Sequence, residues 1–515
     1  MGGAGAEDAG EVPHLQLPGG PTSPQALQRV QDILLAAVGV AAVGVVLLLA
    51  LVHLKDRSAA DHVSGAWMAM TRYAQEGVLY PPLLEDGHYG GTRWMPVAIY
   101  VNLAFATLGS DLLVTGKLAS LCLGTAILGL LYAMLRRLAV GRPMALALVG
   151  TAALSEPMLL ALWAPYRGDS PAALLQLSAV AVMLWRSRAG GVLAGVLAGL
   201  AVLSKASAGW APLAIGALLV FTDRRRLVEF ALALGLVVAG GLGLFTQLSQ
   251  GRIWENLLTL STEQLSLRGL LGAAEKALIA LEHSVQPLLL LLPLATVELV
   301  GAALSRRLGP HHLALAAAGL ITWVVFADPG VYTNHLIDLV LLVALAVGAL
   351  WARLARAPQA GWARGLVVAV VLTAAVAGYE VKVAPELKGW LRGTASHDLG
   401  VYARLASPGD RVLSEDPTVP VRLGQRPVVL DAFMWRRIEA RRPELTAPLY
   451  RRVAAGEFDR VILLSDPEAG LRKGWYGQAH FSVALIRAIQ ARYRLEGEEA
   501  GYRVFVPRTR TSTAP

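Results

Sequence analysis

Charge is scarce in this sequence of 515 residues. Asp, Glu, Lys and Arg make up 16% of the chain, and hydrophobic residues make up 55%. In a typical soluble domain, charged residues account for about 25%. This balance excludes an ordinary soluble protein, and it predicts a polytopic α-helical membrane protein.

Cysteine and several recurrent motifs are also missing. The single cysteine, Cys122, lies in an apolar run and excludes an intrachain disulfide. No repeat of about 20–50 residues occurs. The chain after residue 381 contains no GxGxxG motif, no P-loop and no metal-spaced Cys/His pair. These absences predict a binding or lid role for the C-terminal part rather than independent catalysis.

Long apolar runs are what the sequence has in abundance. A helix that crosses a bilayer needs about 20 mostly apolar residues. About eleven such stretches are predicted, several of them short or interrupted, near 33–53, 113–135, 143–162, 170–185, 189–204, 208–222, 227–247, 284–303, 311–327, 336–352 and 364–380. The first is predicted to be kept rather than cleaved as a signal peptide. A polar leader of about 30 residues precedes it, and no small-residue cleavage site follows.

Basic residues gather in every second loop between these stretches. The basic loops are 135–142, 185–188, 223–226, 305–307 and 351–364. Because cytoplasmic loops carry the excess of Lys and Arg, the N-terminus is predicted to lie inside. The net charge of +9 then reflects topology rather than a nucleic-acid surface. A further span at 96–109 would break the alternation, so that stretch is predicted to be an interfacial helix on the outer surface.

This topology divides the chain into three parts. Residues 1–26 are predicted to be a disordered cytoplasmic leader, 27–380 the membrane domain, and 381–515 a small extracytoplasmic α/β domain. Outside the membrane lie the loops 54–112, 163–169 and 248–283 and the chain after 381. In the last part, predicted strands alternate with helical stretches, the strands being 411–416, 426–433, 460–466 and 502–507. The stretch 480–493 is predicted to be a helix with Val483, Ile486 and Ile489 on one face.

Charged residues stand out in the outer loops. Asp61 lies a few residues beyond the first apolar stretch, and "APYRGDSPAALL" (164–175) places Arg167 and Asp169 between two apolar helices. Asp61 would serve as a general base if burial raised its pKa, and otherwise it is a solvated loop acid. Arg167 and Asp169 are predicted to pair with each other beside a polar site. Alternatively, Asp169 or Ser170 caps the following helix.

The order of these segments resembles that of the C-type (GT-C) integral-membrane glycosyltransferases. The resemblance is strongest in "DHVSGAWMAMTRYAQEGVLY" (61–80) and "YRGDSPAALLQLSAVAVML" (166–184). It extends to "GVLAGVLAGLAVLSKASAGWAPLAI" (191–215) and "DPGVYTNHLIDLVLLVALAVG" (328–348). Relatives include dolichyl-phosphate-mannose–protein mannosyltransferases and bacterial lipid A aminoarabinose transferases. His62 stands where relatives often have Glu, and His335 replaces a tyrosine.

The resemblance implies transfer of a sugar from a polyprenyl-phosphate donor to a hydroxyl acceptor at the outer face of the cytoplasmic membrane, with inversion. It assigns Asp61 as the base and Asp169 as a second acid. A divalent metal is left open, and these two acids would hold it. The partners are the lipid-linked sugar, membrane lipid and a glycan, lipid or protein acceptor. No nucleic acid is expected.

Further residues are implied to contact the substrates. The predicted phosphate ligands are Arg93, Arg167 and Lys205, and the predicted substrate contacts are His62, Tyr80 and His335. Arg252 and Arg268 in the loop 248–283 also have the charge to bind a phosphate, or alternatively they are simply solvated. Lys205 is alternatively a lysine whose charge extends to the membrane interface, and His335 a hydrogen-bonded interfacial histidine.

Two other classes of function remain open from the sequence. One is a polytopic transporter or lipid flippase without transferase activity. Transporters carry charges near the middle of their spans, and here such charges are nearly absent. The other is a non-catalytic scaffold whose outer domain binds a partner, which would leave the loop acids without a role.

Overall fold

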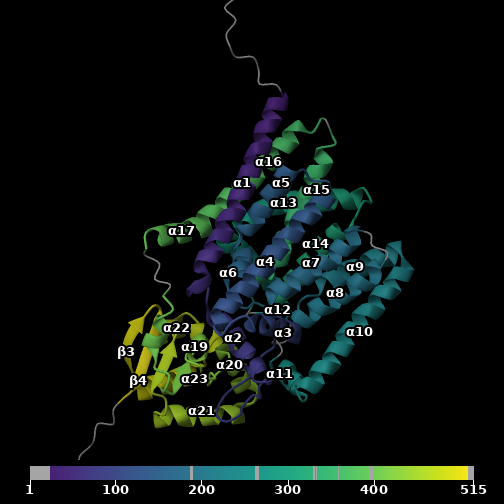
Figure 1. The fold of residues 1–515 in the computed structure, drawn as a ribbon. Helices are drawn as coiled ribbons and strands as arrows, with labels where there is room; N and C mark the ends of the chain where they lie inside the picture. Colours follow the sequence, from purple (N-terminus) through teal and green to yellow (C-terminus); the bar gives the residue numbers. More distant parts are fainter. Residues whose placement is uncertain are drawn as a thin grey trace, which may run out of the picture.

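Helices dominate the computed structural model, and a small β-sheet lies near the C-terminus (Figure 1). The structure describes residues 24–185, 189–260, 266–328, 331, 333–357, 359–393 and 398–508. The predicted leader, 1–26, falls outside these residues except for its last three. The basic residues at 186–188 also fall outside them.

Six helices of the described chain are long and apolar enough to cross a membrane. They are α1 (Pro24–Val52), α4 (Leu112–Arg137), α10 (Arg224–Leu248), α13 (Gln286–Leu304), α15 (Ile337–Leu354) and α16 (Gly361–Gly378). The described chain has five shorter apolar helices, α3 (Pro96–Ala106), α7 (Asp169–Trp185), α8 (Gly190–Ser204), α9 (Trp210–Thr222) and α14 (Pro310–Phe326). The prediction of a polytopic helical membrane protein is confirmed.

The predicted span 143–162 differs from a single helix. It consists of α5 (Arg142–Ala153) and α6 (Glu156–Trp163), which are bent by 77° relative to each other. Pro157 lies in the first turn of α6. Because proline has no N–H and its ring clashes with the preceding turn, it cannot continue α5. The chain therefore turns at this point, just before the Arg167 segment.

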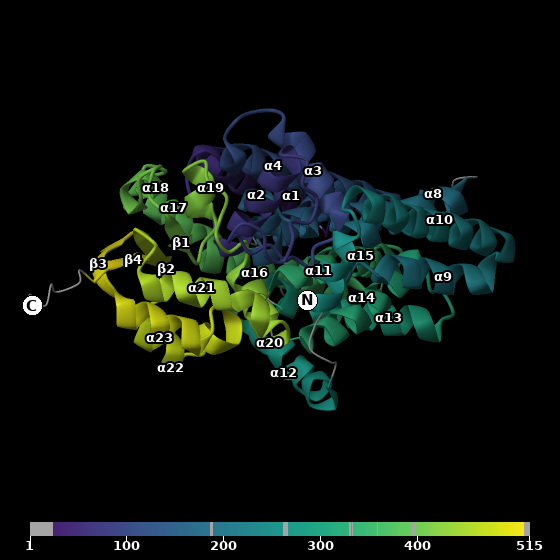
Figure 2. The same ribbon diagram turned by 90° about the horizontal axis from the view of Figure 1, so that it is seen from below.

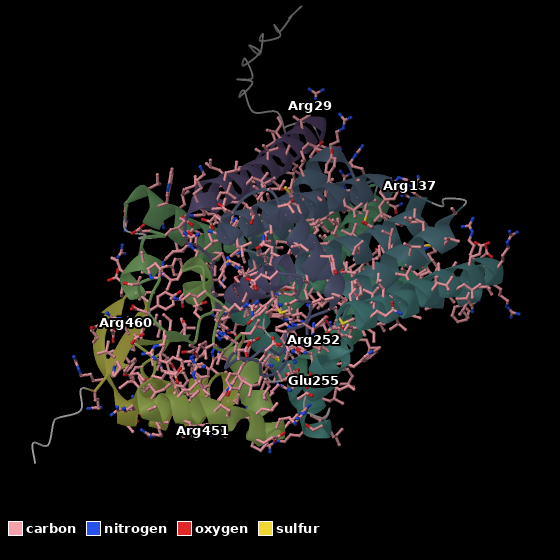
Figure 3. The ribbon with its side chains drawn as sticks, turned by 60° about the horizontal axis from the view of Figure 1, so that its bottom comes forward. Arg29, Arg137, Arg252, Glu255, Arg451 and Arg460 are labelled. Carbon is pink, nitrogen blue, oxygen red and sulfur yellow. The ribbon has the colours of Figure 1, made fainter. Side chains whose placement is uncertain are left out.

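The two ends of the helical bundle differ in charge and in what they carry. Arg29 and Arg137 lie at one end, and Arg252, Arg451 and Arg460 at the other (Figure 3). We call the first the basic end, since Arg137 of the basic loop 135–142 lies there. We call the second the domain end, since it carries the C-terminal domain, α2 and α3 (Figure 1). All four predicted outer segments meet at the domain end.

Short helices form the domain end of the molecule. They are α2 (His62–Gln75), α3 (Pro96–Ala106), α11 (Arg252–Leu260), α12 (Leu267–Ser284) and α17 (Ala384–Leu391). The predicted interfacial helix at 96–109 corresponds to α3. With 11 residues and a rise of about 1.5 Å per residue, α3 is too short to cross a bilayer, and it packs on α2, α4 and α8.

Cysteine labelling tests which end faces the cytoplasm. In a background with Cys122 replaced by Ala, we expect Arg225→Cys at the basic end to react only after the membrane is opened. We expect Ala440→Cys at the domain end to react with an impermeant reagent in intact cells. Both positions are exposed. The reverse pattern would overturn the orientation and the location of any site at the domain end.

The C-terminal domain is built around a four-stranded mixed sheet. Its strands are β1 (Val412–Ser414), β2 (Arg460–Leu463), β3 (Tyr493–Glu499) and β4 (Tyr502–Pro507), in the order β1-β2-β4-β3. Strands β1 and β2 are parallel, and the other pairs are antiparallel. Six helices complete it, α18 (Val401–Leu405), α19 (Thr418–Arg422), α20 (Ala432–Arg441), α21 (Pro443–Ala455), α22 (Pro467–Arg472) and α23 (Val483–Arg492).

Two predictions within this domain are wrong in detail. The run 426–433 is not a strand of the sheet. Its backbone pairs with the loop 54–112 instead, because Tyr89 N donates to Val428 O and Leu430 N donates to Tyr89 O. In α23, Ile486 and Ile489 are buried as predicted, but Val483 is 50% exposed because it begins the helix.

The loop 54–112 docks on the C-terminal domain. Helix α2 packs on α19, and the approach is close at Gly65, where a Cβ would lie 2.6 Å from Asp416 Oδ1 and Thr418 N. Tyr89 is fully buried, and its hydroxyl donates to Leu445 O. Seen from the domain end, the C-terminal domain lies beside α2 and away from α8 and α10 (Figure 2). The first loop and the C-terminal domain therefore form one packed unit.

Candidate active site

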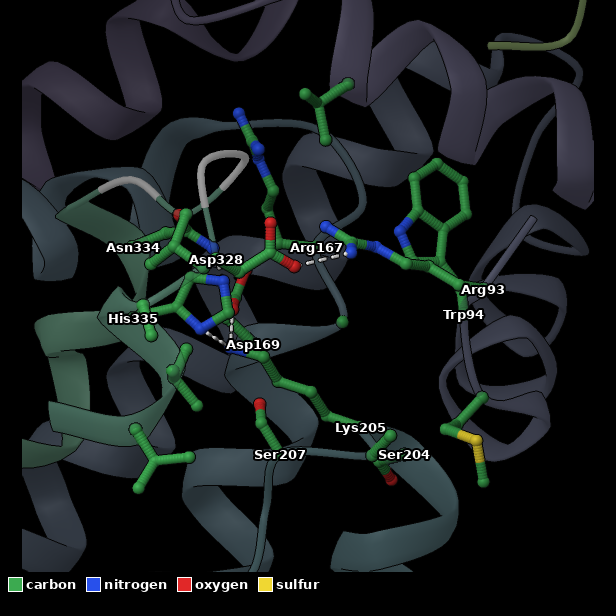
Figure 4. Close-up of a pocket in the computed structure, with 18 of the residues that line it drawn as sticks. Arg93, Trp94, Arg167, Asp169, Ser204, Lys205, Ser207, Asp328, Asn334 and His335 are labelled. Carbon is green, nitrogen blue, oxygen red and sulfur yellow. Dashed lines mark hydrogen bonds and ion pairs between the residues drawn. The ribbon is translucent and has the colours of Figure 1, made fainter. Parts of the chain in front are cut away.

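A cavity of about 590 Å³ opens at the domain end of the helices. Its size lies in the range of about 300–1,000 Å³ that is typical of small-molecule sites. Segments far apart in the chain bring polar side chains to it, namely Arg93, Arg167, Asp169, Lys205, Asp328 and His335 (Figure 4). Five of these six were predicted as site residues from the sequence.

Three ion pairs form at the cavity, each between different segments. Arg167 Nη2 lies 2.5 Å from Asp61 Oδ2, and Lys205 Nζ lies 2.5 Å from Asp169 Oδ1. Arg93 Nη1 lies 3.0 Å from Asp328 Oδ2. The predicted pairing of Arg167 with Asp169 is therefore wrong. Arg167 reaches back to the first loop, whereas Asp169 faces the turn after α8.

Asp61 has two separate tasks in the structure. Its Oδ1 accepts a hydrogen bond from Ser64 N at 2.8 Å and caps α2. Its Oδ2 receives the guanidinium of Arg167, which is itself buried. Asp61 does not line the cavity itself but stands directly behind Arg167.

The pKa of Asp61 is set by two opposing effects. Protein atoms crowd its carboxyl although 42% of the side chain remains exposed, and this desolvation alone would raise the pKa. The charge of Arg167 and the bond from Ser64 outweigh it and hold the pKa below the ordinary value. The premise that burial raises this pKa is thus wrong. Asp61 is a carboxylate that is held by a cation.

Asp169 belongs to a compact polar group. Its Oδ1 accepts from Lys205 Nζ and, at 3.0 Å, from Asn334 Nδ2. Lys205 Nζ also lies 3.2 Å from His335 Nδ1. These bonds join the start of α7, the end of α8 and the short turn η2 (Thr333–Leu336). The side chain of Asp169 bonds to Lys205 and Asn334 in other segments, which does not favour the helix-cap interpretation.

His62 and Tyr80 are not among the residues that line the cavity. The His62 ring lies 4.4 Å from the ring of His480 in the C-terminal domain. Tyr80 is fully buried, and its hydroxyl donates to Trp94 O at 2.6 Å. Tyr80 thus stabilises the loop 54–112 near Trp94. Neither residue lines the cavity, and their contact with substrate stays a prediction.

Sequence reasoning missed Asp328 and Asn334. Both follow α14, and both hold a predicted site residue in place, Arg93 in one case and Asp169 in the other. Asp328 has the appearance of a helix-terminal acid in the sequence, so only its position in space distinguishes it. Asn334 stands next to His335 in the quoted segment and was the easier of the two to find.

The two arginines of the loop 248–283 have different surroundings. Arg268 is exposed, lines the cavity and has no ion pair among the described residues. Arg252 donates to Tyr80 O at 2.8 Å and holds the first loop. Arg268 is therefore the cation most accessible to an incoming anion.

The described residues contain no group of three or more His, Cys, Asp or Glu side chains that would hold a metal ion. Asp61 and Asp169 are each bound to a cationic side chain instead. The residues present do not fit a hard divalent cation, so no chemical step is assigned to one.

Solved structures share this architecture, although no family model and no curated protein matches the sequence. ArnT from Cupriavidus metallidurans bound to undecaprenyl phosphate has a TM-score of 0.58 and 14% identity, with 92% of this chain and 98% of that chain covered. Its apo structure gives a TM-score of 0.57 at 14% identity, with 90% and 97% covered. The chain has the GT-C fold.

An archaeal member of the GT-C fold gives a weaker match. The oligosaccharyltransferase from Archaeoglobus fulgidus, in complex with Zn and sulfate, has a TM-score of 0.50 and 14% identity. It covers 90% of this chain and 73% of that chain. The coverage of ArnT includes the C-terminal domain as well as the helices, so the GT-C architecture extends over nearly the whole chain.

Proposed function

We propose that the protein is a glycosyltransferase that moves a sugar from a polyprenyl phosphate to a hydroxyl acceptor. The observation that carries this proposal is the cavity at the domain end of a GT-C fold, which two acids and four cations line. A third acid, Asp61, stands behind Arg167 and pairs with it. ArnT from Cupriavidus metallidurans, with the same fold, binds undecaprenyl phosphate. A lipid phosphate requires such cations, and activation of a hydroxyl requires such an acid.

The reaction takes place at the outer face of the membrane. Arg137 of the basic loop 135–142 lies with Arg29 at the opposite end of the bundle (Figure 3), and basic loops stay in the cytoplasm. The cavity and the C-terminal domain then face outward. Nucleotide sugars are cytoplasmic, which favours a lipid-linked donor.

Asp61 is the base in this proposal, and Arg167 controls it. The carboxylate takes the proton of the acceptor hydroxyl while the oxygen attacks the anomeric carbon. Paired with Arg167 at 2.5 Å, Asp61 is a weak base. The negative charge of the donor phosphate competes for Arg167, and the loosened pair leaves Asp61 more basic. Attack by the acceptor itself, with no covalent sugar–enzyme intermediate, inverts the anomeric centre.

Cations stabilise the departing lipid phosphate. Arg268 is exposed and lines the cavity. Lys205 and Arg93 line it as well, from other segments of the chain (Figure 4). Asp169 and Asn334 keep Lys205 in position. Charge that develops on the phosphate in the transition state is then met by donors already in place.

The position of the cavity argues against a transporter or flippase. Transporters bind their substrates near the middle of the membrane, between repeats. Here the cavity lies at the domain end of the helices, where its charged side chains come from loops and helix ends. A scaffold without activity would not need three acid–base pairs around a cavity.

Lys205→Met is expected to raise the KM for the donor by about 10- to 100-fold, since a charge-assisted hydrogen bond contributes about 1.5–3 kcal/mol. The KM for the acceptor should scarcely change. Lys382→Met is the matched control, because Lys382 forms an ion pair with Glu156 at 2.5 Å and does not line the cavity. Initial rates at varied donor and acceptor concentrations give both constants. A change in the acceptor constant alone would remove Lys205 from the phosphate site.

The donor can be identified in cells that lack the protein. Lipid extraction and mass spectrometry should show a sugar-linked polyprenyl phosphate that accumulates in a deletion strain. The wild-type gene should return it to its normal level, and the Asp61→Asn gene should not. Unchanged lipid-linked sugars in the deletion strain would count against the proposal.

A further inference from the structure

The C-terminal domain contains a buried ion pair for which the proposed reaction has no direct use. Glu415 and His480 are 1% and 3% exposed, and Glu415 Oε1 lies 2.8 Å from His480 Nδ1. Three further donors reach this carboxylate, Trp475 Nε1 at 2.7 Å, Leu464 N at 2.8 Å and Tyr476 Oη at 2.9 Å. Glu415 is thus held in one position from four sides.

The ring of His480 connects this buried pair to the first loop, because it contacts both Trp475 and His62. Its ring stacks on Trp475 with 4.0 Å between centroids and 19° between planes. On the other side, the ring of His62 meets it edge-on at 4.4 Å and 71°. His62 is the first residue of α2 and directly follows Asp61. The His480 ring therefore contacts the residue that directly follows the proposed base, Asp61, in the chain.

Several charged groups face His62. They are Asp61 from its own loop, Asp416 and Asp431 from the C-terminal domain, and His480. Burial lowers the pKa of His62, and the charge of His480 lowers it further, while the three carboxylates oppose this shift. His62 is accordingly neutral at neutral pH, although it lies among acids.

We propose that His480, fixed by Glu415, is a positioning residue for Asp61, acting through His62. The C-terminal domain then completes the active site rather than merely covering it. The catalytic part of this inference rests on the proposed function. The structural part, that His480 sets the surroundings and the pKa of His62, does not rest on the proposed function.

The desolvation cost of the Glu415–His480 pair favours a positioning role over a role in stability. A buried ion pair costs about as much in desolvation as it returns in attraction, and well-packed apolar residues often replace it without loss. An ion pair in a small domain is a poor source of stability, but it fixes the orientation of an imidazole. The N-terminus of α2 needs such an anchor, since Asp61 both caps the helix and pairs with Arg167.

The test uses the full-length double variant Glu415→Gln/His480→Phe. It keeps a ring on Trp475 and leaves no unpaired buried charge. A glutamine amide offers a single acceptor oxygen, so one buried donor to position 415 loses its acceptor, and the thermal unfolding midpoint should fall only modestly. Turnover should fall about 10- to 100-fold, as expected when a reacting group is misplaced, with the donor KM unchanged. The matched control is Glu468→Gln/Arg487→Leu, which removes an exposed ion pair of the same domain.

A second measurement does not depend on activity. In protein with ¹³C-labelled histidine in nanodiscs, NMR follows the titration of His62, which is assigned through His62→Gln. Its titration midpoint should rise in the double variant and stay unchanged in the control. His480→Gln removes the same charge and keeps the Glu415 carboxylate, so it should give a rise at least as large, and it serves if the double variant does not fold.

The outcomes separate this inference from the proposed function. A double variant with wild-type turnover and pH profile, or a His62 midpoint that does not move, overturns the positioning role. If the wild type uses no polyprenyl-phosphate sugar, the proposed function fails. The His62 titration still decides whether His480 controls the first loop.

Discussion

Asp61→Asn is expected to lower turnover by about 10²- to 10⁴-fold, the usual contribution of a general base. Asparagine retains an oxygen that accepts the bond from Ser64 N, so the cap of α2 persists. What it loses is the negative charge beside Arg167 and the ability to take a proton. Turnover of the purified variant measures the loss, and its thermal unfolding shows whether it remains folded.

Asp111→Asn is the matched control for this experiment. Asp111 also caps a helix, α4, and also forms an ion pair, with Arg422 of the C-terminal domain. It does not line the cavity. The same chemical change at Asp111 should leave turnover within a few-fold of the wild type. Near-normal turnover of Asp61→Asn would remove Asp61 from the mechanism.

Asp169→Asn and Asp169→Ser should each remove most of the activity, by about 10²-fold or more, because Lys205 loses the carboxylate that positions it. Serine and asparagine cap helices about as well as aspartate. If Asp169 were only a cap, both variants would therefore be active. Steady-state turnover of the two purified variants distinguishes the two roles.

A double variant separates the activity of this pair from its stability. Asp169→Asn leaves the ammonium of Lys205, which is 22% exposed, without its carboxylate, at a cost of up to about 3 kcal/mol. Asp169→Asn/Lys205→Met removes both charges and should recover the thermal unfolding midpoint. Transfer should not recover. A double variant that regains activity would reduce the Lys205–Asp169 pair to a structural contact.

Local sequence patterns predicted the membrane helices well. Each predicted apolar stretch coincides with a helix or, at 143–162, with the bent pair α5 and α6. Apolar composition over about 20 residues is sufficient for this, because a bilayer requires internally satisfied helices. Pro157 marks the bend in the sequence as well, although its angle depends on packing.

The partners in the site could not be read from the sequence. Arg167 pairs with Asp61, 106 residues away, rather than with Asp169, two residues away. Arg93 pairs with Asp328, 235 residues away. Such choices depend on how the loops pack at one end of the bundle. The prediction of a strand at 426–433 was wrong for the same reason, since its backbone forms hydrogen bonds with Tyr89 in the loop 54–112.

The central claim is that this cavity consumes a polyprenyl-phosphate-linked sugar. The direct measurement is the release of polyprenyl phosphate by the purified protein in proteoliposomes. It uses a panel of synthetic donors and an envelope extract as the acceptor source. We predict that the wild type releases the lipid phosphate from a donor of this class, that Asp61→Asn does not, and that nucleotide sugars are not used. Equal release by wild type and Asp61→Asn, or release from no donor of the panel, would contradict the account.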